Sequence, residues 1–318
     1  MGLATYLARR LVIAVALLVI VATLNFAVVH LAPGGPTSVL LSDPRITAAG
    51  REQILASYGL NKPLYVQYFD YIAGMFTGNW GTSYFYLQPV FQVIAARIPN
   101  TLLLMVPSLL LTIGLGILMG VTSARRSFSA IDRSLSSIAF FFYSMPAFWL
   151  GFMLLTVFSL DVRWLPPGGI SSVDGGGVVD VLRHLALPML TLTLVNIANF
   201  SLLMRTSLLQ VLDQNFITTA RGKGLSERVV FFRHAFRNAL LPTVTMTGLF
   251  VGFLLTGAIL TESVFSWPGL GLLTFNSILS HDYPVVLGLF FMFSIMIIGA
   301  NLVTDLVYGL LDPRITYD

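Results

Sequence analysis

The most charged stretch of this sequence is residues 213–244, which reads DQNFITTARGKGLSERVVFFRHAFRNALLPTV. It contains two acids, Asp213 and Glu227, and five basic residues, Arg221, Lys223, Arg228, Arg233 and Arg237. Apolar residues recur there at helical spacing, Gly222 and Gly224 interrupt the pattern, and Ser226 is suited to cap a second helix. We therefore predict two short amphipathic helices joined at a glycine elbow.

The sequence contains no pattern typical of catalysis or metal binding. Lys223 lies between two glycines, but the GxxxxGK[ST] spacing of a phosphate-binding loop is absent. There is no HExxH helix and no GxSxG nucleophile turn. His184 and His234 are isolated, and the chain has no cysteine. We expect no catalytic residue, no metal site and no cofactor in this chain.

Composition places the chain in a membrane. Of its 318 residues, 56% are hydrophobic and 10% are charged, whereas soluble domains carry roughly 25% charged residues. The net charge of +4 is no nucleic-acid signature, because the arginines lie at the ends of apolar runs, where they set orientation and contact anionic lipid. We expect an all-α membrane protein in contact with the lipid bilayer, with no nucleic-acid partner.

The apolar runs predict six transmembrane helices within a single transmembrane domain, 1–318. They cover about 11–31, 101–122, 135–160, 185–209, 240–259 and 285–311. The first run is longer than the roughly 7–15 apolar residues of a signal peptide, so we expect it to be retained as a span. Between the runs lie an outside insert, 33–98, a second outside loop, 161–183, and the basic loop, 211–238.

The distribution of basic residues supports this topology. The twelve placed inside are Arg9, Arg10, Arg125, Arg126, Arg133, Arg205, Arg221, Lys223, Arg228, Arg233, Arg237 and Arg314. The other six of the 18 are Arg45, Arg51, Lys62, Arg97, Arg163 and Arg183. An excess of basic residues on one side marks the cytoplasmic face. Both termini are therefore expected in the cytoplasm.

Several residues outside the basic loop carry further predictions. Asn196 and Asn199 share one helix face, which indicates either hydrogen bonds between helices or a solute path. Ser144 lies two residues before Pro146, which should kink the third span. Trp267 is either an interface anchor or part of a gate, and the anchor is favoured. The candidate pathway or gate residues are thus Asn196, Asn199, Ser144 and Trp267.

Three patterns concern packing at the spans and the outside insert. Gly116 and Gly120 form a GxxxG pair that permits close helix packing. The aromatic-rich segment 64–76 is predicted to be a helix at the bilayer interface, where an aromatic belt is favoured over a binding site. His30, near the end of the first run, is expected to be a solvated or hydrogen-bonded group.

The basic loop resembles a known family. The run FITTARGKGL, followed by RHAFRNALLPTV, is similar to the coupling loop of inner-membrane subunits of ABC importers, in particular the permeases for dipeptides and oligopeptides. GLNKPLYVQY, GNWGTS and ESVFSWPGLG also resemble stretches of that family. Where the wider superfamily has Glu-Ala-Ala, this chain has Thr218, Thr219 and Ala220, a departure that is similar to the peptide branch. Gly224 matches the family's glycine.

The resemblance implies a type I ABC importer permease fold. It implies that the loop is the coupling helix, seated on an ATPase subunit through Phe216, Ile217, Thr218, Thr219, Ala220, Arg221, Gly222, Lys223, Gly224 and Leu225. It further implies a sister permease, two ABC ATPase subunits that bind ATP and magnesium, an extracytoplasmic solute-binding protein, and a multi-pass location in the bacterial cytoplasmic (inner) membrane.

Other functions stay open at this point. Relatives in the family also carry haem or nickel complexes, and nothing in the spans tells these solutes from peptides. A secondary transporter would be expected to place ionisable residues at the middle of its spans, where this chain has few. An intramembrane enzyme would need a Ser/His or paired-Asp constellation, which is not evident.

Overall fold

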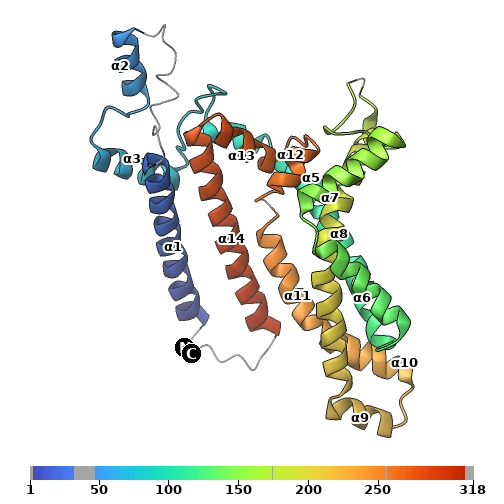
Figure 1. Ribbon diagram of the computed structural model, residues 1–318. Helices are drawn as coiled ribbons and strands as arrows, with labels where there is room; N and C mark the ends of the chain where they lie inside the picture. The colour runs from blue at the N-terminus through green and yellow to red at the C-terminus, as the bar shows by residue number, and fades with distance from the viewer. Residues whose placement is uncertain (1–2, 32–46, 174, 255, 312–318) are drawn as a thin grey trace. The chain divides into compact units, whose positions relative to one another are not determined.

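The computed structural model describes residues 3–31, 47–173, 175–254 and 256–311 (Figure 1). Arg45, Arg314 and the side chains of Arg51 and Asp305 lie outside the described residues. The α-helices are α1 Leu3–Leu31, α2 Ala48–Ser57, α3 Leu64–Thr77, α4 Val90–Ala95, α5 Ile98–Arg125, α6 Ala130–Tyr143, α7 Ala147–Leu155, α8 Gly177–Leu212, α9 Asn215–Gly222, α10 Glu227–Val229, α11 Arg237–Gly252, α12 Ile259–Val264, α13 Leu270–Leu279 and α14 Tyr283–Leu311. Two π-helical segments, η1 Thr156–Asp161 and η2 Val230–Phe236, continue α7 and α10.

Within these described ranges, four helices are long and apolar enough to cross a membrane: Ala8–Leu31, Val90–Arg125, Gly177–Leu212 and Tyr283–Val303. A fifth crossing results if Ala130–Tyr143 and Ala147–Asp161, which meet at 97°, count as one broken span. The chain is thus an all-α membrane protein. Six spans with cytoplasmic termini remain a prediction.

The third predicted span, 135–160, is broken rather than merely kinked. Helix α6 ends at Tyr143, and α7 begins only after Pro146, whose ψ of 132° is extended. A proline ring also disfavours helical backbone at the residue before it, here Met145. Ser144 therefore lies exposed at the break, with its hydroxyl donating to the carbonyl of Phe140 at 2.8 Å.

The fifth predicted span, 240–259, ends earlier than the apolar run does. Helix α11 has 16 residues and ends at Gly252. Gly257 adopts φ +70°, which does not fit a right-handed helix and favours glycine. The continuous apolar run predicted one helix over 240–259, whereas the left-handed conformation of Gly257 requires α11 to end before that residue.

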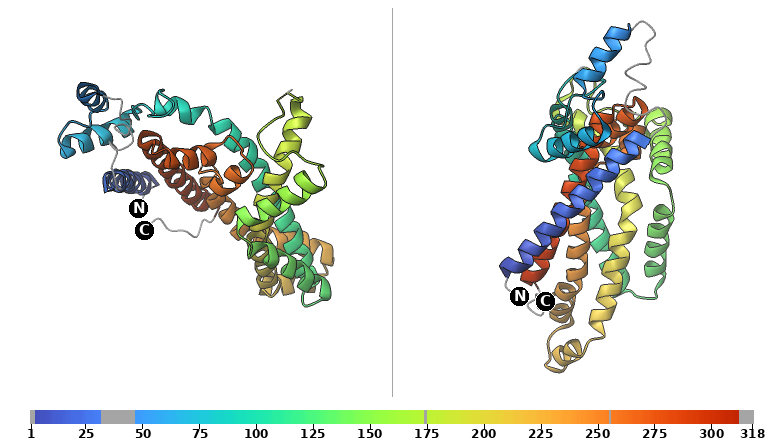
Figure 2. Two further views of the ribbon diagram at one scale, coloured as in Figure 1. Left: turned by 45° about the horizontal axis from the view of Figure 1, so that its top comes forward. Right: turned by 90° about the vertical axis from the view of Figure 1, so that its left-hand side faces the viewer.

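The described chain divides into two compact units. The terminal unit contains 1–101, 255–259 and 268–318, and the central unit contains 102–254 and 260–267. In the terminal unit α1 runs beside α14, with α3 against α1 and with α4 and α13 against α14 (Figure 2). In the central unit α8 packs against α6, α7 and α11. The prediction of a single membrane domain stays a prediction.

The core of the terminal unit joins the outside insert to the last helix. Val90, Ile94, Leu270 and Leu289 are buried together in it. Beside this core, the fully buried carboxylate of Asp282 accepts hydrogen bonds from the Ser83 hydroxyl and from the backbone N–H groups of Tyr84 and Phe85. Buried carboxylates need such donors, so Asp282 fixes the insert to the start of α14.

The GxxxG prediction is confirmed in the central unit. A Cβ atom built on Gly116 would lie 2.5 Å from Cβ of Phe200, and one built on Gly120 would lie 2.5 Å from the carbonyl oxygen of Ser201. Real Cβ atoms essentially never approach that closely. Helices α5 and α8 therefore contact each other along these two glycines.

The ESVFSWPGLG stretch forms a tight turn between α12 and α13. Ser266 adopts φ +48° within it. In the terminal unit the carbonyl of Pro268 accepts from Asn100 Nδ2 at 2.9 Å, and the N–H of Leu270 donates to Thr101 Oγ1 at 2.7 Å. Pro268 and Gly269 therefore lie in a sharp turn.

Trp267 is fully buried in the central unit, against Leu104 and Leu185. A tryptophan that anchors a protein at the bilayer interface presents its ring to the headgroups, which a buried ring does not do. The favoured interpretation of Trp267 as an interface anchor is therefore wrong, because the tight turn carries the ring into the core of the unit.

Candidate functional site

The basic loop folds as the sequence predicts, into two helices that meet at a glycine elbow. Helix α9, Asn215–Gly222, ends at the elbow, and α10 with η2 follows it. Gly224 adopts φ +75°, whereas Gly222 is the last residue of α9. The N–H of Gly224 bonds to the carbonyl of Arg221 at 2.9 Å, and the N–H of Leu225 bonds to the carbonyl of Ala220 at 3.4 Å. These two bonds make a Schellman motif, in which glycine is the favoured left-handed residue.

The apolar stripe of the loop points inward. Ile217 and Ala220 are buried, at 0% and 6% exposure. They join a cluster, here called the loop core, whose buried members are Ala124, Met204, Leu208, Ile217, Ala220, Val230, Ala235 and Ala239. Exposed apolar stripes often mark contacts with a partner, but this stripe instead covers the chain's own α8 and η2.

The exposed surface of the loop contains apolar, polar and charged residues. Phe216 and Leu225 are 42% and 40% exposed. The other exposed members of the predicted coupling set are Thr218, Thr219, Arg221, Gly222, Lys223 and Gly224. We call these eight residues the loop face. Two of the ten predicted residues, Ile217 and Ala220, therefore support this face from beneath instead of belonging to it.

An ion pair closes the elbow on its exposed side. The guanidinium of Arg221 donates to both carboxylate oxygens of Glu227, at 2.8 and 3.3 Å. Its hydrogen bond to Glu227 raises the pKa of Arg221. Ser226 stands at the N-cap of α10, as predicted, but its side chain makes no capping hydrogen bond. The elbow is thus held by backbone geometry and one exposed ion pair.

The second helix of the loop departs from α-helical geometry. Seven residues, Val230–Phe236, are π-helical, and such segments are uncommon and frequently mark functional sites. The guanidinium of Arg125, at the end of α5, lies 5.3 Å from the ring centroid of Phe231. The sequence pattern missed the π segment, because apolar spacing does not distinguish one added residue per turn over so short a stretch.

A buried ion pair beside the loop core was also missed. Arg205 of α8 donates to both oxygens of Asp132, with Nε–Oδ1 and Nη2–Oδ2 distances of 2.7 Å, and the Asp132 side chain is 4% exposed. Asp132 also accepts from the N–H of Phe128 at 2.9 Å, and the hydroxyl of Ser129 caps α6. The S-x-x-D spacing of a capping box was the available signal for Asp132. The pair fastens α6 to α8.

The four residues named as pathway or gate candidates differ in their exposure. Asn196 and Asn199 are half-buried on α8, and Asn196 Nδ2 donates to the carbonyl of Leu192 at 2.9 Å. Ser144 is exposed at the α6–α7 break, and Trp267 is in the core. A role for these four in a pathway stays a prediction.

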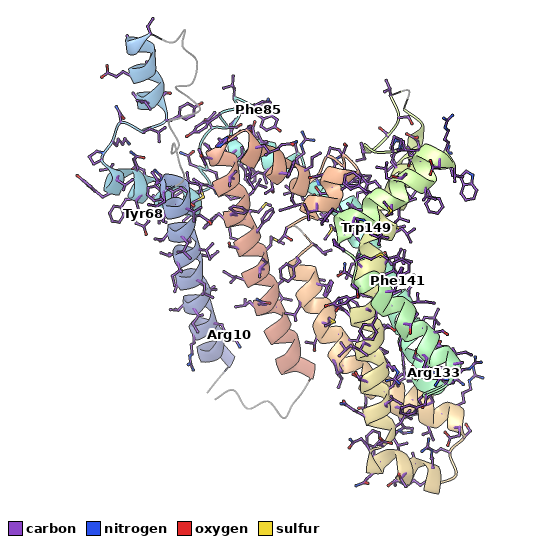
Figure 3. The ribbon with its side chains drawn as sticks, viewed as in Figure 1. Arg10, Tyr68, Phe85, Arg133, Phe141 and Trp149 are labelled. Carbon is purple, nitrogen blue, oxygen red and sulfur yellow. The ribbon has the colours of Figure 1, made fainter. Side chains whose placement is uncertain are left out.

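The two arginines labelled in Figure 3 each lie toward one end of a helix. Figure 3 shows Arg10 at the end of α1 remote from Tyr68 of α3. It also shows Arg133 at the end of α6 near α10, with Phe141 farther along α6 and Trp149 on α7. Arg10 and Arg133 are both among the basic residues expected on the cytoplasmic side.

We expect Asp132→Ala to destabilise the protein more than loss of the exposed Arg221–Glu227 pair does. Breaking a buried pair leaves a charge without its partner, at a cost of roughly 3–5 kcal/mol. Because the Arg205 side chain is 19% exposed, water can partly solvate the unpaired guanidinium. We therefore expect the free energy of unfolding to fall by about 2–3 kcal/mol. The measurement is unfolding in detergent micelles, with Glu227→Ala as the matched control. Equal melting of the two variants would contradict this expectation.

Comparisons with known proteins place most of the chain in one family. Residues 112–317 match the family model described as binding-protein-dependent transport system inner membrane component, and residues 3–105 match the corresponding N-terminal model. The chain is 38% identical to the oligopeptide transport system permease protein AppB of Bacillus subtilis, over 99% of this chain and 100% of that one.

Two further relatives cover this chain almost entirely. It is 36% identical to the di/tripeptide transport system permease protein DppB of Pseudomonas aeruginosa, over 98% of this chain and 99% of that one. It is likewise 36% identical to the dipeptide transport system permease protein DppB of Escherichia coli K12, over 98% of each chain. These relatives are transport subunits and not enzymes. The chain therefore belongs to the family of inner membrane components of binding-protein-dependent transport systems.

Proposed function

We propose that this chain is the transmembrane subunit of an ATP-driven ABC importer for dipeptides or oligopeptides. The proposal includes six spans, with α11 as the fifth, cytoplasmic termini and a multi-pass location in the bacterial inner membrane. The family membership and the peptide-permease names of relatives at 36–38% identity support it. ATP and magnesium would be bound by separate ATPase subunits and not by this chain.

The observation that carries the proposal is that the loop core packs beneath the loop face and joins it to α8. Ile217 and Ala220 of α9 pack in one buried cluster with Met204 and Leu208 of α8. Packed interiors transmit displacement because they are dense and little compressible. A push on α9 by a partner would therefore move α8, which belongs to the membrane part of the chain.

The proposed partners follow from this arrangement and from the family. A sister permease would complete the solute pathway, and an ABC ATPase would dock on the loop face of each permease. An extracytoplasmic solute-binding protein would deliver the solute. Binding and hydrolysis of ATP would then drive alternating access, with the loops carrying the motion of the ATPases to the spans.

We expect the purified chain alone neither to hydrolyse ATP nor to transport any solute. The complex reconstituted in vesicles with its ATPases, sister permease and binding protein should take up a dipeptide only when ATP is present. Haem and a nickel complex should be offered in parallel. ATP turnover by the isolated chain, or uptake of one of those solutes in place of a dipeptide, would overturn the proposal.

We expect the loop to face the cytoplasm. Since the chain has no cysteine, single cysteines can be introduced without background. Ser226→Cys is a mild change because the Ser226 side chain is exposed and makes no capping bond. An impermeant thiol reagent on intact cells should label Val173→Cys, whose position is fully exposed in the second outside loop, but not Ser226→Cys. Labelling in the reverse order would refute this topology.

A further inference from the structure

A cavity in the terminal unit takes no part in the coupling described above. Its volume is about 420 Å³, within the range of roughly 300–1,000 Å³ that is typical of small-molecule sites. It lies among the end of α1, the connection from α2 to α3, α3 itself, the segment 79–84 and the start of α14.

Hydrogen bonds hold the walls of this cavity in place. His30 of α1 bonds through Nδ1 to the carbonyl of Phe26 at 2.9 Å and through Nε2 to Oε1 of Gln67 at 3.3 Å. Gln67 of α3 also donates through Nε2 to the carbonyl of Lys62 at 2.7 Å. Gln67 thus ties α3 to both neighbouring segments. The expectation that His30 is hydrogen-bonded is confirmed, and the cavity is preformed.

Aromatic side chains form part of the walls, and one of them has a hydroxyl without a partner among the described residues. Tyr58 and Tyr84 line the cavity and meet edge to face, with ring centroids 4.7 Å apart. Tyr71 also lines it, and the buried hydroxyl of Tyr71 has no hydrogen-bond partner among the described residues. Burial raises the pKa of Tyr71, so this hydroxyl keeps its proton at neutral pH. A buried hydroxyl without a partner is costly, and a ligand with a polar group would satisfy it.

Two opposite charges stand at the cavity. Lys62 Nζ and Asp70 Oδ2 lie 2.6 Å apart, and their side chains are 49% and 56% exposed. Exposed pairs of this kind contribute little to stability. A ligand that brings its own carboxylate and ammonium group can therefore replace this pair without much loss.

We propose that this cavity binds a small zwitterion with an apolar or aromatic body, its anionic group at Lys62 and its ammonium group at Asp70. The aromatic walls receive the body, and the Tyr71 hydroxyl supplies a further donor. Two sources have this chemistry: a short peptide with free ends, and the headgroup of a zwitterionic phospholipid. The inference rests on the proposed function only in its choice of a dipeptide as the first probe.

The test uses the full chain in nanodiscs made of anionic lipid, with binding measured by calorimetry. The probes are alanyl-phenylalanine, the same dipeptide with acetylated and amidated ends, and glycerophosphoethanolamine. We expect saturable binding of the free dipeptide and none of the capped one. Lys62→Met and Asp70→Asn should each weaken binding at least about tenfold, because hydrogen bonds to charged groups are the strong ones. Tyr71→Phe, which removes only the hydroxyl, should weaken it by a smaller factor.

The controls separate a lost site from a lost fold. Arg133→Met removes an exposed basic side chain of α6, outside both the cavity and the loop face, and should leave binding unchanged. Melting temperatures of all variants should match the wild type, since Lys62 and Asp70 are exposed. Binding of glycerophosphoethanolamine alone, with the same sensitivity to both variants, supports the zwitterion site and identifies lipid as its source. No saturable binding of either probe, or equal binding by wild type and both variants, overturns the inference.

Uptake of the same dipeptide by the assembled complex distinguishes the two proposals. Import of the dipeptide without any binding at the cavity would refute the inference but would not contradict the proposed function. Binding at the cavity by a complex that imports no peptide would leave the site standing and refute the proposed function.

Discussion

Replacing Gly120 by alanine is expected to separate α5 from α8 and to lower the free energy of unfolding by about 1–3 kcal/mol, the usual cost of overpacking. The added methyl group would meet the carbonyl oxygen of Ser201 at 2.5 Å and Cβ of Met204 at 2.7 Å. The first of these is backbone, so it cannot rotate away, and one helix must shift. Met204 also belongs to the loop core, so the shift should reach the loop.

The same helix offers a matched control. A Cβ atom on Gly114 would meet no atom within 4 Å, so Gly114→Ala changes helix propensity without adding a clash. We expect Gly114→Ala to melt at or above the wild-type temperature in detergent, since alanine favours helix over glycine by up to about 1 kcal/mol. If Gly114→Ala and Gly120→Ala melted alike, the close contact along α5 and α8 would have to be abandoned.

Replacing Gly224 by aspartate is expected to abolish coupled uptake while the protein remains inserted and the ATPases remain active. Gly224 holds the left-handed position of the Schellman motif, at φ +75°, where a side chain costs roughly 1–2 kcal/mol. A Cβ there would meet no atom of the chain within 4 Å, so the fold should survive. The new carboxylate would lie in the loop face, where an unpaired charge buried under a partner costs several kcal/mol.

Gly224→Asn separates the charge from the backbone effect. Asparagine tolerates the left-handed region about as well as aspartate, and it has nearly the same shape without the charge. We expect the Asn variant to keep most uptake and the Asp variant to lose it at least about tenfold, with uptake and ATP hydrolysis measured side by side. Wild-type uptake by the Asp variant would contradict docking of a partner on the loop face and would leave the loop only a role in setting membrane topology.

The sequence predicts best those features that local chemistry decides. The α3 helix was expected over 64–76 and is found over Leu64–Thr77, because proline before it and glycine after it limit it on both sides. Gly224 was found in the same way, as a glycine between two periodic segments. The close contact of α5 with α8 at Gly116 and Gly120 was predictable because glycine has no side chain to hold two helices apart.

The features that the sequence missed depend on partners distant along the chain. Periodicity identified Ile217 and Ala220 as an apolar stripe, but it cannot say whether the chain itself or another protein covers the stripe. The partner of Arg205, Asp132, lies 73 residues away in the sequence. The burial of Trp267 likewise results from a turn whose direction composition does not specify.

The pairing of α1 with α14 has a consequence for biosynthesis. The first helix leaves the ribosome long before the last one exists, and membrane insertion of the intervening chain occurs in between. During that time α1 lacks the neighbour that buries Ala22 beside Phe291. The terminal unit can therefore mature only after translation ends, whereas the central unit is already complete in sequence. A chain truncated before α14 would present an unpaired first helix to the quality-control proteases of the membrane.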